Sequence, residues 1–396
     1  MSTFVVHSNV LRRSGMARHS VIRVLNSVTH TSAPLNQFAL YRARHLPEEQ
    51  GFIVSLAPPT QDILDYCAAQ QLVGRLELRH GGGRVPVFLE VLHKLVAAAR
   101  AQGPVLLHLH HPATGSLVQL LKTPLLGRVP VLYTVHNAFH TPKNRALTRL
   151  NFLLADHVTF VGDASYEAFP RVLRRRKAAL SVVPNGVDLE RVDRVLAELG
   201  GSEPEATRAV TPPEFKLVTV GRMVEAKYQT FLLELTAQLP PHVTLTLVGD
   251  GTKAPALRAR ARDLGIAARV TFTGLVPRDE VFRRMRAADL FVSSSLWEGL
   301  PVAVLEAMAS RLPALLSDIA PHRELERRAP RLGVAPLELP RWVEAVTALA
   351  RLPREARVAL GRENRAAVES HFSLATMQAG YSRLYDKLWQ RGVTVR

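Results

Sequence analysis

The sequence predicts an α/β protein made of two doubly wound domains in tandem. The chain has 396 residues, 47% of them hydrophobic, which is too long for one ordinary core and favours two domains. Short apolar, β-branched runs alternate with helix-length segments along both halves of the chain, a pattern typical of parallel sheets covered by helices on both faces. Glycine and polar residues follow many of these runs, at the strand ends where open α/β sheets bind ligands.

The first half of the chain contains six predicted strands with helical patterns between them. The strands are residues 3–7, 51–56, 104–110, 129–134, 157–161 and 180–183, and helical patterns include residues 17–28, 88–100 and 144–155. A turn at Asn185 and Gly186 ends this series. We therefore predict an N-terminal domain over residues 1–190. The charged segment 191–213, which ends in two prolines, is predicted to be a linker.

The second half shows the same alternation more clearly. Its predicted strands are residues 216–220, 243–248, 269–273, 289–295 and 313–317, each followed by a helix-length segment. These strands predict a C-terminal domain over residues 214–373. The last segment, 374–396, contains apolar or aromatic residues at helical spacing from Met377 to Leu388, which predicts an amphipathic helix.

One strand–turn–helix segment places a carboxylate on each side of its turn. The strand over residues 289–295 is broken by Gly299, and the proline at position 301 suits the first helical position, where its missing N–H costs nothing. Glu298 is therefore expected in the loop at the carboxyl end of a strand, and Glu306 about a turn and a half into the next helix. The free backbone amides of Gly299 and Leu300 would point at an anion or an oxygen-rich ligand.

Further polar and glycine residues are predicted at the same edge of the C-terminal sheet. The positions after the other strands are Gly221, Arg222, Lys227, Gly249, Gly251, Gly274 and Asp318. Arg222 and Lys227 offer a planar fork of donors and a point charge, which suit two phosphate groups. Glu306 is suited to the hydroxyls of a ribose and Glu298 to those of a sugar. The ligand predicted by these residues is a nucleoside diphosphate that carries a sugar.

The N-terminal half offers weaker candidates. Gly15 precedes the helical pattern 17–28, where a helix N-terminus would accept a phosphate. Four histidines, His108, His110, His111 and His136, follow or end two predicted strands. They are explained by exposure to solvent or by structural hydrogen bonds, and a metal site made of them is the less favoured alternative because no carboxylate or cysteine is near in sequence. We predict no metal site.

Together these motifs resemble those of the retaining, nucleotide-sugar-dependent glycosyltransferases of family four. The residues that carry the resemblance are Glu298 and Glu306 within EGLPVAVLEAMAS, Gly221-Arg222 with Lys227, LVGDG at 247–251, NGVD at 185–188, and Ser317-Asp318. The resemblance is strong from about residue 182 to the end and looser from 3 to 160. Two departures stand out: Ser14-Gly15 replaces the paired glycines that are frequent in the first loop, and Tyr228 replaces the usual glycine after Lys227.

The resemblance implies a GT-B architecture of two Rossmann-like domains facing a cleft, with the helix at 374–396 crossing back onto the N-terminal domain. It implies a donor site in the C-terminal domain and an acceptor site in the N-terminal domain. By the same resemblance, Arg222 and Lys227 match the diphosphate-binding pair, and Glu306 matches the ribose-binding acid. Glu298 matches the acid beside the donor sugar, Gly15 the phosphate-contacting loop, and His136 a histidine near the reacting sugar.

The predicted activity is transfer of a hexose from a UDP- or GDP-sugar to an acceptor hydroxyl, with retention at the anomeric carbon and no cofactor. The acceptor is expected to be lipid-linked, a saccharide or a small molecule, in cell-surface polysaccharide or glycolipid synthesis. Two alternatives remain. A nucleotide-sugar epimerase of the same fold would form product without an acceptor. A non-catalytic binder of anionic surfaces or nucleic acid would rest on the charge of the chain alone.

Composition bears on location and partners. The net charge is +17, and it is densest at residues 171–177, which suggests peripheral contact with an anionic membrane. Nucleic-acid binding is not expected, because aromatic residues make up only 6% of the chain and no stacking motif is present. The single cysteine, Cys67, and the absence of a long apolar run or a signal peptide predict a cytoplasmic protein, peripheral at the inner face of the membrane.

Overall fold

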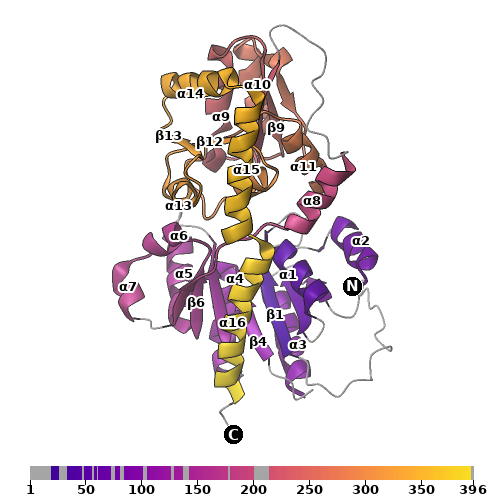
Figure 1. The fold of residues 1–396 in the computed structure, drawn as a ribbon. Helices are drawn as coiled ribbons and strands as arrows, with labels where there is room; N and C mark the ends of the chain where they lie inside the picture. The colour runs from indigo at the N-terminus through magenta and orange to yellow at the C-terminus, as the bar shows by residue number, and fades with distance from the viewer. Residues whose placement is uncertain are drawn as a thin grey trace. The chain divides into compact units, whose positions relative to one another are not determined.

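The computed structural model describes residues 19–25, 34–46, 49–55, 58–59, 61–72, 76–80, 84–100, 105–125, 129–136, 142–176, 179–199 and 214–393. The chain divides into two compact units. Unit 1 comprises Met1–Val161, Ser165–Val183 and Ala375–Arg396, and unit 2 comprises Gly162–Ala164 and Pro184–Leu374. Each unit has its own parallel sheet (Figure 1), so the predicted fold class of two doubly wound α/β domains is confirmed.

In unit 1 the described residues form a seven-stranded sheet with the order β3-β2-β1-β4-β5-β6-β7. The strands are β1 (His19–Leu25), β2 (Glu49–Ser55), β3 (Leu76–His80), β4 (Val105–Leu109), β5 (Val131–Val135), β6 (His157–Phe160) and β7 (Leu180–Val182). The helices are α1 (Pro34–His45), α2 (Gln61–Ala69), α3 (Arg84–Arg100), α4 (Pro112–Leu125), α5 (Pro142–Leu154), α6 (Asp163–Glu167), α7 (Arg171–Arg176) and α16 (Leu374–Val393). Apolar residues of β1, β4, β5 and β6 form the main core with α3 and α5.

The beginning of the chain differs from the prediction. The predicted strand at 3–7 and Gly15 lie outside the described residues, and residues 19–25 form strand β1 instead of part of the predicted helix 17–28. Val21, Ile22 and Val24 are all fully buried, as expected of a central parallel strand with both faces covered. Arg23 interrupts this run, and its charge suggested the polar face of an amphipathic helix. In the structure Arg23 is also buried, and it forms an ion pair with Glu49 at 2.7 Å.

Helix α16 packs within unit 1, as the expected crossing back of the last helix requires. The Tyr385 hydroxyl lies 2.7 Å from Nδ1 of His108 in β4. The hydroxyls of Tyr381 and Thr134 lie 3.2 Å apart. Because Tyr381 and Tyr385 are both fully buried, these hydrogen bonds satisfy polar groups that would otherwise be costly to bury.

In unit 2 the described residues form a six-stranded parallel sheet with the order β10-β9-β8-β11-β12-β13. The strands are β8 (Phe215–Val220), β9 (Val243–Val248), β10 (Val270–Phe272), β11 (Leu290–Ser293), β12 (Ala314–Ser317) and β13 (Gly333–Ala335). The helices are α8 (Leu189–Glu198), α9 (Gln229–Gln238), α10 (Ala254–Asp263), α11 (Arg278–Arg286), α12 (Val302–Ala309), α13 (Ala320–Arg328), α14 (Leu339–Arg351) and α15 (Arg354–His371). All five strands predicted in this half are present.

Part of the predicted linker is helical. Residues 191–198 belong to α8, which begins after Asp188, whose side chain accepts a hydrogen bond from the backbone N–H of Arg191. Val192 and Val195 on this helix are fully buried, and α8 packs against α11 in unit 2. The charged residues of the segment cover the opposite, solvent-facing side of an amphipathic helix, which is why their density resembled a linker.

The order of the strands in unit 2 creates a binding edge. From β8 the chain moves outward to β9 and β10, and then returns to β11 on the other side of β8 before it continues to β12 and β13. Because right-handed crossovers place the connecting helices of the two directions on opposite faces, the loops after β8 and β11 diverge. A crevice is expected there, at the carboxyl ends of these two strands.

Candidate active site

Three loops of unit 2 pack backbone against backbone at this edge. The N–H of Met223 donates to the carbonyl of Asp250 at 2.8 Å, and the N–H of Gly249 donates to the carbonyl of Gly274 at 3.0 Å. Gly249 has φ +130°, and a Cβ atom there would lie 2.2 Å from the carbonyl oxygen of Gly221. A side chain at Gly249 would therefore separate the loops. The glycines predicted at these strand ends lie together in the structure.

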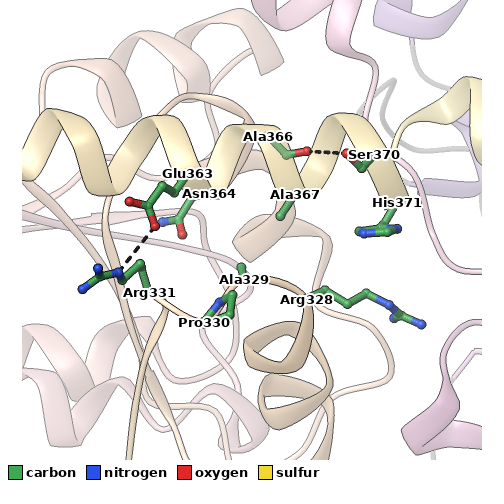
Figure 2. Close-up of a pocket in the computed structure, with 10 residues that line it drawn as sticks. All are labelled: Arg328, Ala329, Pro330, Arg331, Glu363, Asn364, Ala366, Ala367, Ser370 and His371. Atoms are coloured by element: carbon green, nitrogen blue, oxygen red, sulfur yellow. Dashed lines mark hydrogen bonds and ion pairs between the residues drawn. The ribbon is translucent and has the colours of Figure 1, made fainter.

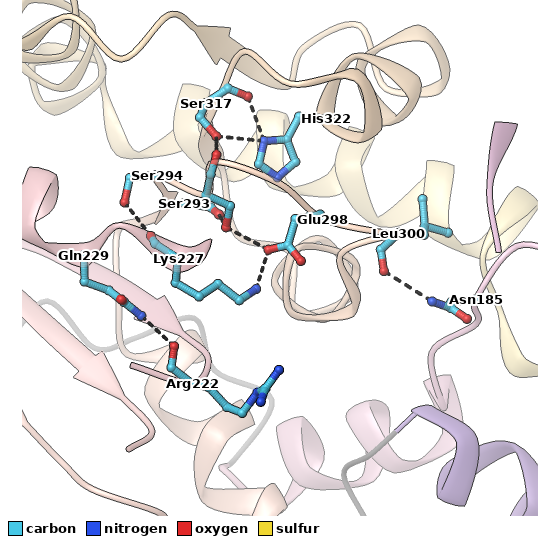
Figure 3. Close-up of polar contacts among 11 residues, drawn as sticks. Asn185, Arg222, Lys227, Gln229, Ser293, Ser294, Glu298, Leu300, Ser317 and His322 are labelled. Carbon is cyan, nitrogen blue, oxygen red and sulfur yellow. Dashed lines mark hydrogen bonds and ion pairs between the residues drawn. The ribbon is translucent and has the colours of Figure 1, made fainter. Parts of the chain in front are cut away.

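Lys227 and Glu298 form an ion pair between the loops that follow β8 and β11 (Figure 3). The carboxylate of Glu298 also accepts a hydrogen bond from Oγ of Ser295 at 2.7 Å. The two paired side chains are only 23% and 13% exposed, respectively. The structure thus brings together two residues that the sequence places 71 positions apart, at the point where the strand order reverses.

The backbone on either side of Lys227 is held in place by Ser294. Lys227 ends a short 3₁₀ turn (Glu225–Lys227), and Tyr228 follows with φ +46° before helix α9 begins. A residue with a β-carbon pays on the order of 1 kcal/mol for this left-handed conformation. Oγ of Ser294 donates to the carbonyl oxygens of Lys227 and Tyr228 at 3.0 and 2.9 Å, which stabilises the turn. This geometry explains how Tyr228 replaces a glycine without displacing Lys227.

Arg222 lies on the same loop and is exposed. Its backbone carbonyl accepts a hydrogen bond from Nε2 of the buried Gln229 at 3.0 Å (Figure 3). This hydrogen bond anchors the loop to helix α9. Its guanidinium has no ion-pair partner among the residues described. Arg222 is therefore a cation held on a fixed loop, and Lys227 is a second cation five residues away.

Glu306 is deeply buried instead of open at the edge. It lies on α12 with 1% of its side chain exposed and forms an ion pair with Arg278, the first residue of α11, which is 7% exposed. The loop before α12 also differs by one residue from the prediction: Pro301 is the N-cap and the helix begins at Val302. The carbonyl of Leu300 accepts a hydrogen bond from Nδ2 of Asn185 at 3.2 Å.

The predicted histidines of unit 1 form a cluster at the carboxyl ends of β4 and β5. Nδ1 of His110 lies 3.0 Å from Nε2 of His136, and the rings of His108 and His110 lie 3.8 Å apart between centroids. Burial lowers the pKa of His136 to about 4 and that of His110 well below its ordinary value, so both rings are neutral at pH 7. His111 lies apart, 3.3 Å from the hydroxyl of Thr114. Within the described ranges, no group of three or more His, Cys, Asp or Glu residues is arranged to hold a metal ion.

Comparisons with known proteins identify the family. Residues 35–191 match the family model described as Glycosyltransferase Family 4, and residues 214–351 match the model described as Glycosyl transferases group 1. The two matches together cover most of the chain, in the order in which the two sheets occur. The chain belongs to the family-four glycosyltransferases.

Related proteins agree with this assignment. This glycosyltransferase is 28% identical over 228 residues to the UDP-Gal:alpha-D-GlcNAc-diphosphoundecaprenol alpha-1,3-galactosyltransferase of Escherichia coli, a match that covers 54% of this chain and 58% of that protein. It is 28% identical over 272 residues to the D-inositol 3-phosphate glycosyltransferase of Nocardia farcinica (strain IFM 10152), covering 62% of this chain and 58% of that one. The matches span 34% to 58% of the length of the first three curated relatives.

Solved structures share the fold. Anabaena HepE in complex with UDP and glucose superposes with a TM-score of 0.72 at 18% identity, over 92% of this chain and 99% of that one. The sucrose-phosphate synthase of Thermosynechococcus elongatus gives 0.71 at 16% identity, over 94% and 100%. At these identities the similarity shows a shared fold, the GT-B architecture.

Three polar residues that shape this edge of unit 2 are absent from the sequence-based prediction. Ser294 and Ser295 hold the Lys227 turn and Glu298, and they were visible only as part of an apolar strand. His322 on α13 was not considered. Its Nδ1 donates to the carbonyl of Ser317 at 2.7 Å, and burial lowers its pKa to about 4. The sequence feature that could have indicated His322 is its position five residues after the end of strand β12.

A hollow elsewhere in unit 2 does not involve the predicted site residues. It lies beside α15 and is lined by Arg328, Ala329, Pro330, Arg331, Glu363, Asn364, Ala366, Ala367, Ser370 and His371 (Figure 2). Arg331 and Glu363 pair across it at 3.6 Å, and both are more than half exposed. Arg331 is therefore a suitable control position for substitutions of Arg222.

Proposed function

We propose that this glycosyltransferase moves a hexose from a nucleoside diphosphate to an acceptor hydroxyl with retention at the anomeric carbon. The observation that carries the proposal is the Lys227–Glu298 ion pair at the point where the strand order of unit 2 reverses. In this proposal the ammonium group of Lys227 neutralises the diphosphate, and the neighbouring carboxylate of Glu298 binds the sugar. Arg222 adds a second cation on the same loop.

The chemistry demands stabilisation of charge on the leaving group. As the bond between the anomeric carbon and the phosphate oxygen breaks, its electron pair remains on the nucleoside diphosphate. In this proposal Arg222 and Lys227 neutralise that charge as it develops, which lowers the barrier more than it tightens ground-state binding. The close-packed glycine loops around Gly221 and Gly249 let backbone approach the phosphates.

The two acids have separate roles in the proposal. Glu298 accepts hydrogen bonds from hydroxyls of the donor sugar once the diphosphate takes Lys227 from it. Glu306 binds the ribose hydroxyls while Arg278 holds its carboxylate. We assign neither acid the role of a covalent nucleophile, because Glu298 keeps the hydrogen bond from Ser295 and Glu306 is buried against Arg278. His136 in unit 1 acts on the acceptor side, near the reacting sugar.

The names of related proteins support a nucleotide-sugar donor. The Escherichia coli relative is named for UDP-Gal, and HepE was solved with UDP and glucose and with UDP-glucose. We propose a UDP- or GDP-hexose for this chain. A lipid-linked or saccharide acceptor in surface polysaccharide or glycolipid synthesis is the companion proposal.

A thermal-shift panel of UDP, GDP, ADP and their hexose conjugates tests the donor. At one hundred times its Kd, the correct nucleotide is expected to stabilise the protein by about 2.7 kcal/mol. The shift should shrink in Arg222→Ala and persist in Arg331→Ala, which removes an equally charged but remote side chain. No shift with any nucleotide would move the assignment to a non-catalytic binder.

An epimerase is the competing enzyme class, and one assay separates it from a transferase. An epimerase converts the nucleotide sugar without an acceptor, whereas a transferase needs one. Conversion of the sugar in the absence of added acceptor would therefore favour the epimerase.

We also propose that helix α7 contacts an anionic membrane surface. Arg171, Arg174 and Arg175 line a surface hollow with Tyr166, and Val172 between them is 64% exposed. Basic side chains beside an exposed apolar one fit the headgroup region of an anionic bilayer. No helix in the described part of the chain is long and apolar enough to span a membrane.

Vesicle flotation tests this surface. Binding to vesicles that contain phosphatidylglycerol is expected to weaken at least tenfold in Arg171→Glu/Arg175→Glu, because each basic residue contributes about 1 kcal/mol near such a surface. The double variant Arg331→Glu/Arg341→Glu makes the same change of charge at exposed positions of unit 2. Flotation that is equal with neutral and anionic vesicles, or equal in both double variants, would contradict the proposal.

A further inference from the structure

His110 lies at the reversal point of the sheet in unit 1, and His136 lies at the end of the neighbouring strand β5. The strand order turns between β1 and β4, and His110 directly follows β4. Its backbone N–H donates to the carbonyl of Val24 in β1 at 3.2 Å, so its position is tied to the centre of the sheet. His136 directly follows β5, and the two side chains meet through Nδ1 of His110 and Nε2 of His136 at 3.0 Å.

The ring of His110 packs against His108, a residue whose two ring nitrogens both form hydrogen bonds. His108 uses both ring nitrogens, one with the hydroxyl of Tyr385 and the other with that of Thr134, each at 2.7 Å. His110 therefore rests on a side chain that cannot turn without losing two buried hydrogen bonds.

The hydrogen-bond inventory of the pair determines its tautomers. A neutral imidazole has one N–H and one bare acceptor nitrogen, so one ring must donate and the other accept. Nε2 of His110 is buried and has no hydrogen-bond partner among the described residues. A proton there would leave a buried N–H donor unpaired, and orphaned buried N–H groups are rarer in proteins than under-satisfied acceptors. The proton of His110 therefore lies on Nδ1, and Nε2 of His136 accepts it.

We propose that His110 is a positioning residue that fixes His136 as the Nδ1–H tautomer. With Nε2 occupied, the proton of neutral His136 must lie on Nδ1. His136 then offers substrate a hydrogen-bond donor and not a general base. The functional half of this inference rests on the proposed role of His136 at the reacting sugar, whereas the tautomer itself does not.

Histidine-selective ¹⁵N NMR of the ring nitrogens tests the tautomer directly. In the wild-type protein, with His136 assigned by its loss in His136→Gln, we expect a protonated Nδ1 and a bare Nε2. His110→Asn places an amide N–H where Nδ1 of the imidazole stood, and the His136 spectrum should be preserved. His110→Leu removes the donor, and part of the His136 population should shift to the Nε2–H tautomer.

Kinetics of the same variants test the consequence. His110→Leu is expected to lower kcat about tenfold or more through misplacement of His136, with little change in KM for the donor, and His110→Asn should retain most of the wild-type kcat. A wild-type His136 protonated on Nε2 would overturn the proposal, as would an unchanged His136 spectrum in His110→Leu. If the tautomer is as proposed but His136→Gln transfers sugar at the wild-type rate, the proposed role of His136 fails and the assignment of His110 stands.

Discussion

Replacement of Lys227 by Ala should lower the transfer rate at least tenfold, which corresponds to about 1.4 kcal/mol of transition-state stabilisation. Lys227 is a cation held at the edge of the sheet by Glu298 and by the turn that Ser294 stabilises. Its interaction with a diphosphate strengthens as the leaving group gains charge, so the loss should appear in kcat as well as in kcat/KM. Steady-state transfer of the hexose from the identified donor is the measurement.

Lys253→Ala is the matched control for this experiment. Lys253 lies in the neighbouring loop after β9, pairs with Glu225 at 2.7 Å and is 51% exposed. Its removal makes the same change in charge close to the site and takes away only an exposed ion pair with Glu225, the first residue of the Lys227 turn. The rate should therefore stay within about twofold of wild type. Wild-type rates in both Lys227→Ala and Arg222→Ala would remove the diphosphate assignment.

Replacement of Glu306 by Ala should destabilise unit 2 by about 3–5 kcal/mol, because it leaves the buried guanidinium of Arg278 without its carboxylate. Differential scanning calorimetry should show a transition lowered by on the order of 10 °C. Glu306→Gln keeps a hydrogen-bond acceptor in a side chain of the same shape, so its loss of stability should be smaller than that of Glu306→Ala. Its nucleotide affinity is therefore the cleaner measure of the proposed ribose contact.

A double variant separates the ion pair from simple loss of packing. If the cost comes from an unpaired buried charge, Arg278→Met/Glu306→Ala should be more stable than Glu306→Ala alone. If the double variant and Glu306→Ala were equally unstable, the loss of stability would come from the cavity left on α12 and not from the unpaired charge. A Glu306→Ala protein as stable as wild type would contradict the buried pair.

Apolar runs in the local sequence predicted most strands of both sheets, including the edge strands β7 and β10. All five predicted strands of unit 2 are present, and the central ones, β8, β11 and β12, have neighbouring strands on both sides in a parallel sheet, as their apolar runs predict. β3 and β13 were missed. β3 is an edge strand with charged residues, and β13 has only three residues, so neither contains a long buried run. β1 was mistaken for a helix because Arg23 interrupts its apolar residues, and its burial depends on a partner 26 positions away.

The residue types at the candidate site followed from the sequence, because parallel strands bring their carboxyl ends to one edge whatever the details of packing. The sequence alone predicts that Arg222, Lys227, Glu298 and the glycines after β8, β9 and β10 lie at that edge. Which side chains pair with which was decided by the tertiary structure alone. Lys227 meets Glu298, Glu306 meets Arg278, and His110 meets His136 across 71, 28 and 26 positions of the chain.

The sequence by itself determined two parallel α/β sheets and the family of the chain, and it predicted the edge of unit 2 where we propose that a nucleotide sugar binds. It did so through local patterns, since apolar runs, turn glycines and charged residues act within one strand and its following loop. The burial of Glu306, the charge state of the histidines and the partners of both acids were decided only by the tertiary structure. Those properties depend on desolvation and on distances between elements remote in sequence, which no local pattern contains.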